Sequence, residues 1–238
     1  MTAAEGNRAM TAPATMGRFP YVTEVLAVFA HPDDESFGLG ALLATLADRG
    51  SAVNTLCFTH GEASTFHGVG GDLGVVRANE LAAAAKVLGV ERVELLDYPD
   101  GGLDGVALDE LAEHVRRAAR IARARTLLVF DEGGITGHPD HRRATQAALA
   151  AAATDNLAVI AWTIPATVAN VLNAEFGTSF VGRASDAIDS AVDVDRCRQL
   201  DAIACHAGQS MDNPVLWRRL QLLGDTEHLL LLHTGTRR

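Results

Sequence analysis

The sequence predicts an α/β protein, specifically a Rossmann-like three-layer α/β/α sandwich with a mostly parallel sheet. The first observation is that short apolar runs alternate with longer segments of helical spacing through residues 22–164, as in consecutive βαβ units. The second is that polar segments directly follow the apolar runs. Ligands of such sheets bind beyond the carboxyl ends of the strands, so we expect an active site at that edge.

The first predicted strand covers residues 22–30, an almost wholly apolar run that fits a strand buried on both faces. It ends abruptly in the polar segment 31–35. Leucines at helical spacing follow over residues 38–49, and Gly50 is typical of the residue that ends a helix. The sequence therefore predicts a first strand, a polar turn and a first helix.

The alternation continues along the chain. Further strands are predicted over residues 53–58, 92–96, 126–130 and 157–164. The helices between them are predicted over residues 75–88, 108–123 and 139–153. A loop rich in Gly, Ser and His is expected over residues 59–73, and a turn over residues 98–102.

Beyond residue 165 the pattern is weaker. It predicts a strand over residues 189–194, a helix over 195–206 and a last strand or buried segment over 229–232. The chain has no long linker and no internal repeat, so residues 21–238 are expected to form a single domain. Residues 1–20 have no apolar segment and are expected to be a disordered tail.

Composition excludes several kinds of partner. The formal net charge is −10, whereas a nucleic-acid-binding surface needs clustered Lys and Arg. No apolar run reaches the roughly 18 residues of a membrane span, and no signal peptide is visible. The three cysteines, Cys57, Cys197 and Cys205, form no disulfide framework. These features predict a cytoplasmic protein that neither crosses a membrane nor binds nucleic acid.

Two short segments carry residues that bind metals. His31 and Asp34 are three positions apart after the first strand, and His138 and His141 have the same spacing after the fourth. Such spacing places both side chains of a pair on one helix face. A catalytic zinc usually has three protein ligands and a water. Helix capping is the plainer interpretation of a lone Asp, but two His-Pro-Asp tripeptides behind buried strands favour a metal site.

The segments Ala30–Glu35 and Gly137–His141 resemble the two signature motifs of the LmbE-like, or PIG-L, family of zinc de-N-acetylases. Supporting similarity extends from about residue 24 to about residue 210. It is carried by Arg77 and Glu80 before Leu88-Gly89, by Asp100-Gly101, and by Asp193-Val194 leading to Cys205-His206 and Gln209. Gly208 and Gln199 stand where the family often has Ser and Lys, which leaves substrate detail open.

The resemblance implies the function and the role of each residue. It implies Zn²⁺ held by His31, Asp34 and His141, with ferrous iron as the alternative cation. Asp33 would be the general base, and His138 would stabilise the oxyanion. The activity implied is removal of an acyl, usually acetyl, group from the nitrogen of an amino sugar or glucosaminyl conjugate.

Four further residues are candidates for substrate binding, with lower weight than the metal motifs: Glu35, Arg77, Asp100 and His206. Glu35 is also a candidate for anchoring the site from behind. For Arg77 the alternative is an ion pair with Glu80 on one helix face. The loop 62–73, with Phe66 and His67, is expected to shape the mouth of the site.

Three rival functions stay open. One is a zinc hydrolase of another amide or ester bond, and another is a homologue that binds metal or sugar without turnover. A dinucleotide-binding dehydrogenase is disfavoured because Leu43 stands where the third glycine of the fingerprint would be. The expected partner is a small-molecule amino-sugar conjugate. Assembly into a homo-oligomer is left open by the sequence.

Overall fold

A computed structural model describes residues 22–64 and 72–235 of the chain. The predicted tail over residues 1–20 lies outside the described residues, as do Phe66 and His67 of the predicted mouth loop.

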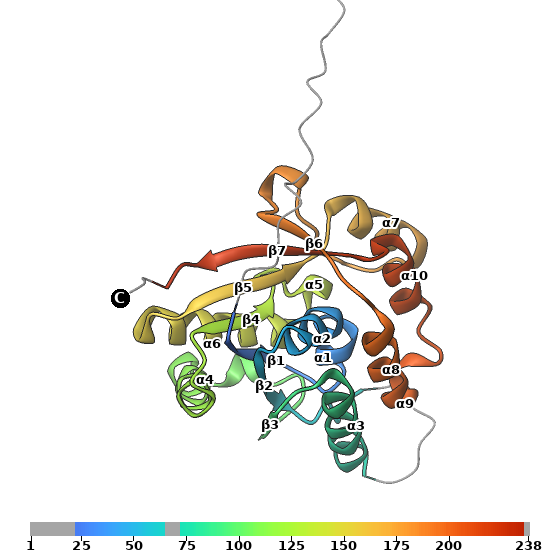
Figure 1. The fold of residues 1–238 in the computed structure, drawn as a ribbon. Helices are drawn as coiled ribbons and strands as arrows, with labels where there is room; N and C mark the ends of the chain where they lie inside the picture. Colours follow the sequence, from blue (N-terminus) through green and yellow to red (C-terminus); the bar gives the residue numbers. More distant parts are fainter. Residues whose placement is uncertain (1–21, 65–71, 236–238) are drawn as a thin grey trace, which may run out of the picture.

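One seven-stranded sheet forms the centre of the protein, in the order β3-β2-β1-β4-β5-β7-β6 (Figure 1). Its strands are β1 (Glu24–Phe29), β2 (Ala52–Thr59), β3 (Arg92–Tyr98), β4 (Thr126–Phe130), β5 (Ala158–Thr163), β6 (Ser190–Asp193) and β7 (Thr226–His233). Strands β1 to β5 are parallel to one another, and β7 pairs antiparallel with both β5 and β6. The mostly parallel sheet predicted from the sequence is confirmed.

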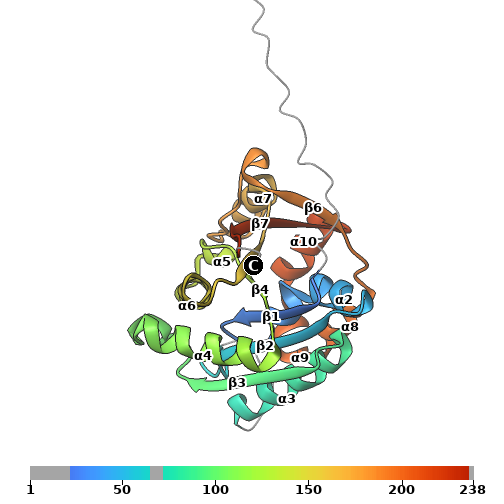
Figure 2. The same ribbon diagram turned by 60° about the vertical axis from the view of Figure 1, so that its left-hand side comes forward.

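Helices cover both faces of this sheet, as the three-layer prediction requires (Figures 1 and 2). The longer helices are α2 (Gly40–Asp48), α3 (Leu73–Leu88), α4 (Leu108–Ala122), α6 (Pro139–Asp155), α7 (Ala166–Phe176), α8 (Cys197–Cys205) and α10 (Pro214–Leu223). The short ones are α1 (Asp34–Phe37), α5 (Gly134–Gly137) and α9 (Ala207–Ser210), with 3-10 turns at Leu103–Gly105 and Ser185–Ala187. No helix of the described residues is long and apolar enough to cross a membrane.

The alternation of side chains along β1 builds two cores. Val25, Ala27 and Phe29 join a core with α2, α3, α7, α8 and α10. Leu26 and Val28 point to the other face and pack with α4 and α6. Because both faces are covered, the strand has to be apolar throughout, which is why its sequence lacks the polar alternation of a half-exposed strand.

Local signals set the ends of the helices. The Asp72 side chain accepts hydrogen bonds from the backbone N–H groups of Gly74 and Val75, which begins α3. The helix ends at Gly89, whose φ of 80° lies in the left-handed region that glycine adopts without steric cost. Both ends agree with the sequence-based prediction to within two residues.

The structure differs from the prediction mainly after residue 165. Helices α7 and α10 were not predicted, and β7 is longer than the segment 229–232 expected from the sequence. Pro165 before α7, and Asn213 with Pro214 at the start of α10, are start signals of helices. In α10 the buried Leu216, Leu220 and Leu223 have helical spacing, a signal that the prediction left unused.

Candidate metal centre and cavity

The order of the strands brings the two His-Pro-Asp segments together. Strands β1 and β4 are neighbours in the sheet, and each carries one segment at its carboxyl end. Asp34 is the first residue of α1, and His138 is the N-cap of α6. Two segments more than 100 residues apart in the sequence therefore meet at one edge of the sheet.

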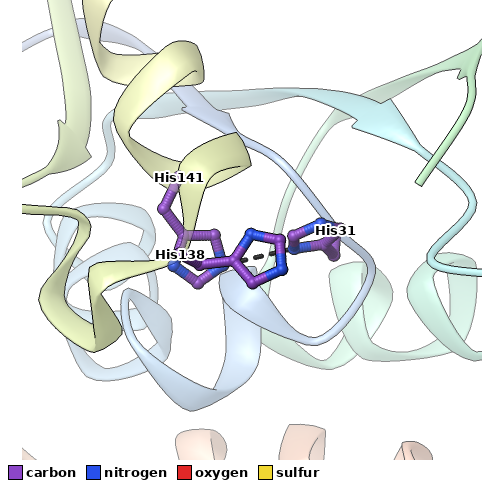
Figure 3. A group of neighbouring side chains, drawn as sticks. All are labelled: His31, His138 and His141. Atoms are coloured by element: carbon purple, nitrogen blue, oxygen red, sulfur yellow. Dashed lines mark hydrogen bonds between the residues drawn. The ribbon is translucent and has the colours of Figure 1, made fainter. Parts of the chain in front are cut away.

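Nitrogen and oxygen atoms of His31, His141 and Asp34 lie at the spacing of a metal site. His31 Nδ1 is 3.2 Å from His141 Nε2 (Figure 3). The Asp34 carboxylate is 3.2 Å from His141 Nε2 and 3.7 Å from His31 Nδ1. Donor atoms 2.0–2.1 Å from a tetrahedral zinc ion would be roughly 3.3 Å apart, so the three groups fit such a cation.

The same three residues are held by hydrogen bonds on their other atoms. His31 Nε2 is 3.0 Å from Asp100 Oδ1 and 3.3 Å from Asp140 Oδ2. His141 Nδ1 is 3.0 Å from the Gly134 carbonyl oxygen. The Asp34 carboxylate accepts from the backbone N–H groups of Ala30 and His31 at 3.2 and 2.9 Å. Ligand histidines are commonly oriented in this way by acceptors behind them.

The electrostatic environment of His31 favours positive charge. Burial alone would lower the pKa of His31, but hydrogen bonds with Asp100 and Asp140 and the charge of Asp34 raise it to about 10. The carboxylates around this imidazole therefore stabilise either a proton or a metal cation. Asp140 is fully buried and also accepts from the Gly101 N–H at 2.8 Å. No role was predicted for Asp140, although it lies inside the second signature segment.

Asp33 lies beside this cluster with its carboxylate on the cavity side. Its φ of 103° is unusual for a residue with a side chain. The Asp33 N–H donates to Glu35 Oε2 at 2.9 Å, and Arg77 Nη2 donates to its carboxylate at 2.6 Å. Burial raises the pKa of Asp33 to about 6, against the opposing charge of Arg77 and with a contribution from Asp34. A carboxylate with such a pKa is suited to accept a proton near neutral pH.

His138 completes a group of three imidazoles whose nitrogen atoms lie within 4.8 Å of one another (Figure 3). Its Nδ1 accepts from the Asp140 N–H at 3.2 Å, so a neutral ring carries its proton on Nε2. Burial and the neighbouring His31 and His141 lower the pKa of His138. A protonated His138 is thus not required for donation, because neutral Nε2–H is already a donor.

Glu35 and His206 lie behind Asp33, and neither is on the wall of the cavity. Both side chains are 0% exposed, and His206 Nε2 is 2.6 Å from Glu35 Oε1. The substrate contact that the sequence suggested for these two residues does not agree with this burial. Their position instead matches the anchoring role considered for Glu35, because Glu35 holds the backbone of Asp33.

Arg77 and Asp100 likewise contact other protein groups. Arg77 donates to the carbonyl oxygens of Gly61 and Pro32 as well as to Asp33. The alternative ion pair of Arg77 with Glu80 is not formed. Both Asp100 oxygens are engaged, one with His31 and the other with the Ala63 N–H at 3.0 Å. In this structure both residues support the centre, and their contact with substrate stays a prediction.

A cavity of about 460 Å³ opens beside the centre, with Asp33, Asp34 and His141 at one end. Its walls are mostly aromatic and aliphatic, formed by Phe37, Phe130, Ile135, Trp162, Phe180 and Leu216. We call this space the apolar cavity. These residues come from six separate elements or loops, and no sequence spacing connects them, so they could not be predicted from the sequence. Arg219 also lines it.

A mostly parallel sheet with a His/Asp cation site and an adjacent carboxylate at its carboxyl edge is typical of metal-dependent α/β hydrolases. The profile of the PIG-L family, described as GlcNAc-PI de-N-acetylase, matches residues 26–152. That match covers more than half of the chain, and the chain belongs to this family of deacetylases. The resemblance inferred from the two signature segments is therefore confirmed.

A curated relative extends the similarity beyond those residues. The 1D-myo-inositol 2-acetamido-2-deoxy-alpha-D-glucopyranoside deacetylase of Salinispora arenicola is 34% identical over an alignment of 215 residues that covers 76% of this chain and 68% of the relative. The matches to deacetylases of the same name from Streptomyces scabiei and Kineococcus radiotolerans span only 47% and 53% of those proteins. The chain thus matches about half to two thirds of the length of these relatives.

Solved structures share the fold at low identity. A zinc-inhibited form of teicoplanin deacetylase has a TM-score of 0.63 at 20% identity, over 87% of this chain and 98% of that one. The 4-carboxy-2-hydroxymuconate hydratase of Pseudomonas putida has a TM-score of 0.68 at 18% identity, over 90% and 98%. Since a hydratase has the same fold, the fold alone does not define the reaction.

Proposed function

We propose that this chain is a zinc-dependent hydrolase that removes an acyl group from the nitrogen of an amino-sugar conjugate. The observation that carries the proposal is the Asp33 carboxylate, held by Arg77, beside three groups whose spacing fits a metal ion, all lining one cavity. Family membership and the amino-sugar substrate named for the Salinispora arenicola relative support the substrate class.

The metal would be held by His31 Nδ1, His141 Nε2 and the Asp34 carboxylate. Two imidazoles and a carboxylate suit zinc and also ferrous iron; zinc is the cation proposed. When bound, zinc supplies Lewis acidity that lowers the pKa of water towards about 7. The hydrogen bonds to the outer atoms of the ligands keep the inner atoms turned towards one point.

Asp33 would act as the general base. It takes a proton from the water that attacks the amide carbonyl carbon, and it returns a proton to the departing amine nitrogen. Arg77 holds one carboxylate oxygen at 2.6 Å, which fixes the orientation of the group. Glu35 accepts the backbone N–H of Asp33 and His206 holds Glu35, so both would position the base without touching the substrate.

His138 would stabilise the negative charge that develops on the carbonyl oxygen. Its Nδ1 is occupied by the Asp140 N–H, so Nε2–H is the free donor. A donor that is held in place before the reaction stabilises such charge without reorganisation. His138 is the alternative to Asp33 as the proton donor to the amine.

A cytoplasmic location is supported by three cysteines that are all free, Cys57, Cys197 and Cys205. A single domain over residues 21–238 is supported by one continuous sheet among the described residues. Assembly into a homo-oligomer stays open.

The test combines metal analysis with a free-amine assay over a panel of N-acyl amino sugars. We expect equimolar zinc and amine release in the wild-type chain. His141→Ala should lose both, because it removes one of three ligands. His114→Ala, on α4, serves as the matched control and should keep both. Equimolar zinc in His141→Ala would refute the ligand set, and a zinc-loaded chain inert on the whole panel would refute the activity.

A further inference from the structure

The apolar cavity extends away from the metal centre on the side of β5 and α10. Asp33, Asp34 and His141 form its inner end, whereas Arg77, Asp100 and His138 are not part of its wall. The scissile amide has to lie at the inner end, within reach of Asp33. One of the two groups joined by that amide, either the sugar or the acyl group, therefore has to enter the cavity.

The chemistry of the wall favours the acyl group. Aromatic rings of Phe37, Phe130, Trp162 and Phe180 dominate it, and a sugar inserted there would leave most of its hydroxyls without partners. A volume of about 460 Å³ is also that of a pocket for a drug-sized ligand. An acetyl methyl group would fill only a small part of it, so a longer acyl chain fits better.

Arg219 introduces a positive charge into this apolar wall. The residue is 7% exposed, and its Nη2 donates to the Phe37 carbonyl oxygen at 2.7 Å. Its Nε is buried and has no hydrogen-bond partner. Within residues 22–64 and 72–235, no carboxylate lies within 4.0 Å of this guanidinium. The charges of Glu227, Asp34 and Asp33 act on this guanidinium only from beyond 4.0 Å. A buried charge without a carboxylate in direct contact is costly, so the position favours an anionic ligand.

Two arginines near Arg219 have carboxylate partners in direct contact. Arg218, the adjacent residue, is paired with Glu175 at 2.8 Å, and Arg196 is paired with Glu227 at 2.5 Å. Glu227 also accepts from Trp162 Nε1 at 2.6 Å, so both of its oxygens are in use. Arg219 has no such partner.

A continuous series of rings connects the metal centre to this charge. The ring centroids of His141 and Phe130 are 5.0 Å apart, and those of Phe130 and Trp162 are 5.2 Å apart. Arg219 Cζ lies 5.2 Å from the centroid of Trp162. An acyl chain that starts at the centre can follow these rings and reach the guanidinium with its far end.

Resting on the proposed function, we propose that the apolar cavity is a subsite for an N-acyl group with a carboxylate at its far end, which pairs with Arg219. Hydrolysis of such a substrate breaks the amide C–N bond. The water oxygen and one proton remain on the acyl carbon as a carboxylic acid, and the other proton goes to the amine. The products are a dicarboxylic acid and the free amino sugar.

The experiment uses the zinc-loaded full chain and N-acyl glucosamines with acyl chains of increasing length. Each chain longer than acetyl is offered as a matched pair, one plain and one with a terminal carboxylate, such as hexanoyl and adipoyl. We expect the best carboxylated member to exceed its plain partner in kcat/KM by roughly tenfold or more, as a charge-assisted hydrogen bond predicts.

Variants of Arg219 test the contact itself. Arg219→Gln should abolish the preference for the carboxylated partner, and Arg219→Lys should restore part of it. Arg218→Gln, the adjacent exposed arginine, is the matched control and should leave all ratios unchanged. A second measurement compares free adipate with free hexanoate as competitive inhibitors. It does not depend on turnover of the longer substrates.

The outcomes separate this inference from the proposed function. Hydrolysis of N-acetylglucosamine without any preference for carboxylated chains, and without stronger inhibition by adipate, would overturn the subsite and leave the hydrolase intact. The subsite would also be overturned if kcat/KM varied with the aglycone while the acyl group was kept as acetyl, and did not vary with the acyl chain. Failure on every acyl chain, acetyl included, would instead reject the proposed function.

Discussion

Asp33 is held from two directions, by Arg77 and by Glu35. Arg77 fixes its carboxylate, and Glu35 accepts the N–H of a backbone with φ of 103°. Such a conformation costs of order 1–3 kcal/mol and persists only where surrounding contacts enforce it. His206 supplies one of those contacts by holding Glu35 at 2.6 Å. The geometry of the base is therefore built from buried charges around it.

Asp33→Asn tests this residue as the base. The amide keeps the shape and the hydrogen bond to Arg77 but cannot take a proton, so kcat should fall by about 10²–10⁴-fold. Zinc content should be unchanged, because Asp33 is not a ligand. Asp48→Asn, in an exposed pair with Arg198, is the control. Near-normal kcat in Asp33→Asn would remove it from this role.

The segment between β4 and α6 is fixed to the sheet by a buried carboxylate. Asp131 accepts two hydrogen bonds from Arg183 at 2.7 and 2.6 Å and one from Thr163 at 2.7 Å. Arg183 ends the segment that contributes Phe180 to the apolar cavity. Through Gly134, the same turn also supplies the acceptor for His141. Asp131 thus joins one cavity wall to the metal centre.

Arg183→Gln should destabilise the protein by about 2 kcal/mol, because it leaves Asp131 buried without its counter-ion. Burial alone would raise the pKa of Asp131, but Arg183, the Gly133 N–H and Thr163 lower it. Because the pKa of Asp131 is lowered in the folded state, its ionised contacts stabilise the protein fully above the ordinary pKa of 3.8. This stabilisation is lost as the pH falls through the folded-state pKa.

Thermal unfolding at several pH values measures this effect. The difference in Tm between wild type and Arg183→Gln should be constant near neutral pH and should narrow below about pH 4. Arg120→Gln, which removes an exposed pair with Glu113, should lower Tm very little at any pH. An equal effect of both substitutions would show that the Asp131 contact does not stabilise the fold.

The elements that sequence could predict are those with one dominant signal. Strand β4 was predicted with its observed bounds, Thr126–Phe130, because it is uniformly apolar and buried. Helix α10 was not predicted, although Pro214 begins it and its buried Leu216, Leu220 and Leu223 have helical spacing. Its place in the structure depends on packing over the apolar cavity, which no local pattern encodes.

The same distinction holds for the site. The convergence of His31, Asp34 and His141 followed from two motifs placed after neighbouring strands. The partners behind them could not be predicted, because contacts such as Arg77 with Asp33 join segments that only the folded chain brings together. Arg219 carried no signal at all in the sequence.

Metal binding should stabilise the protein as a whole, since the proposed ligands belong to two distant segments. A ligand at a hundredfold excess over its Kd adds about 2.7 kcal/mol to the free energy of unfolding. For a domain of this size that raises Tm by roughly 5–10 °C. Scanning calorimetry of the chain with zinc, and after removal of zinc by a chelator, measures the shift.

His141→Ala is again the informative variant, because it should show almost no difference between the two conditions. A chelator that leaves the Tm of the wild type unchanged would contradict the ligand assignment. An equal shift in wild type and His141→Ala would indicate that zinc binds elsewhere on the folded chain.

The adjacency of β1 and β4 in the sheet has one more consequence. Residues 22–64 contain two of the proposed ligands and residues 126–235 contain the third. Neither stretch could therefore supply all three ligands by itself. A cation bound here would cross-link an early and a late portion of the polypeptide. The affinity for the cation would then depend on how stably those two portions pack against each other. A substitution far from the ligands that weakens this packing would lower the affinity.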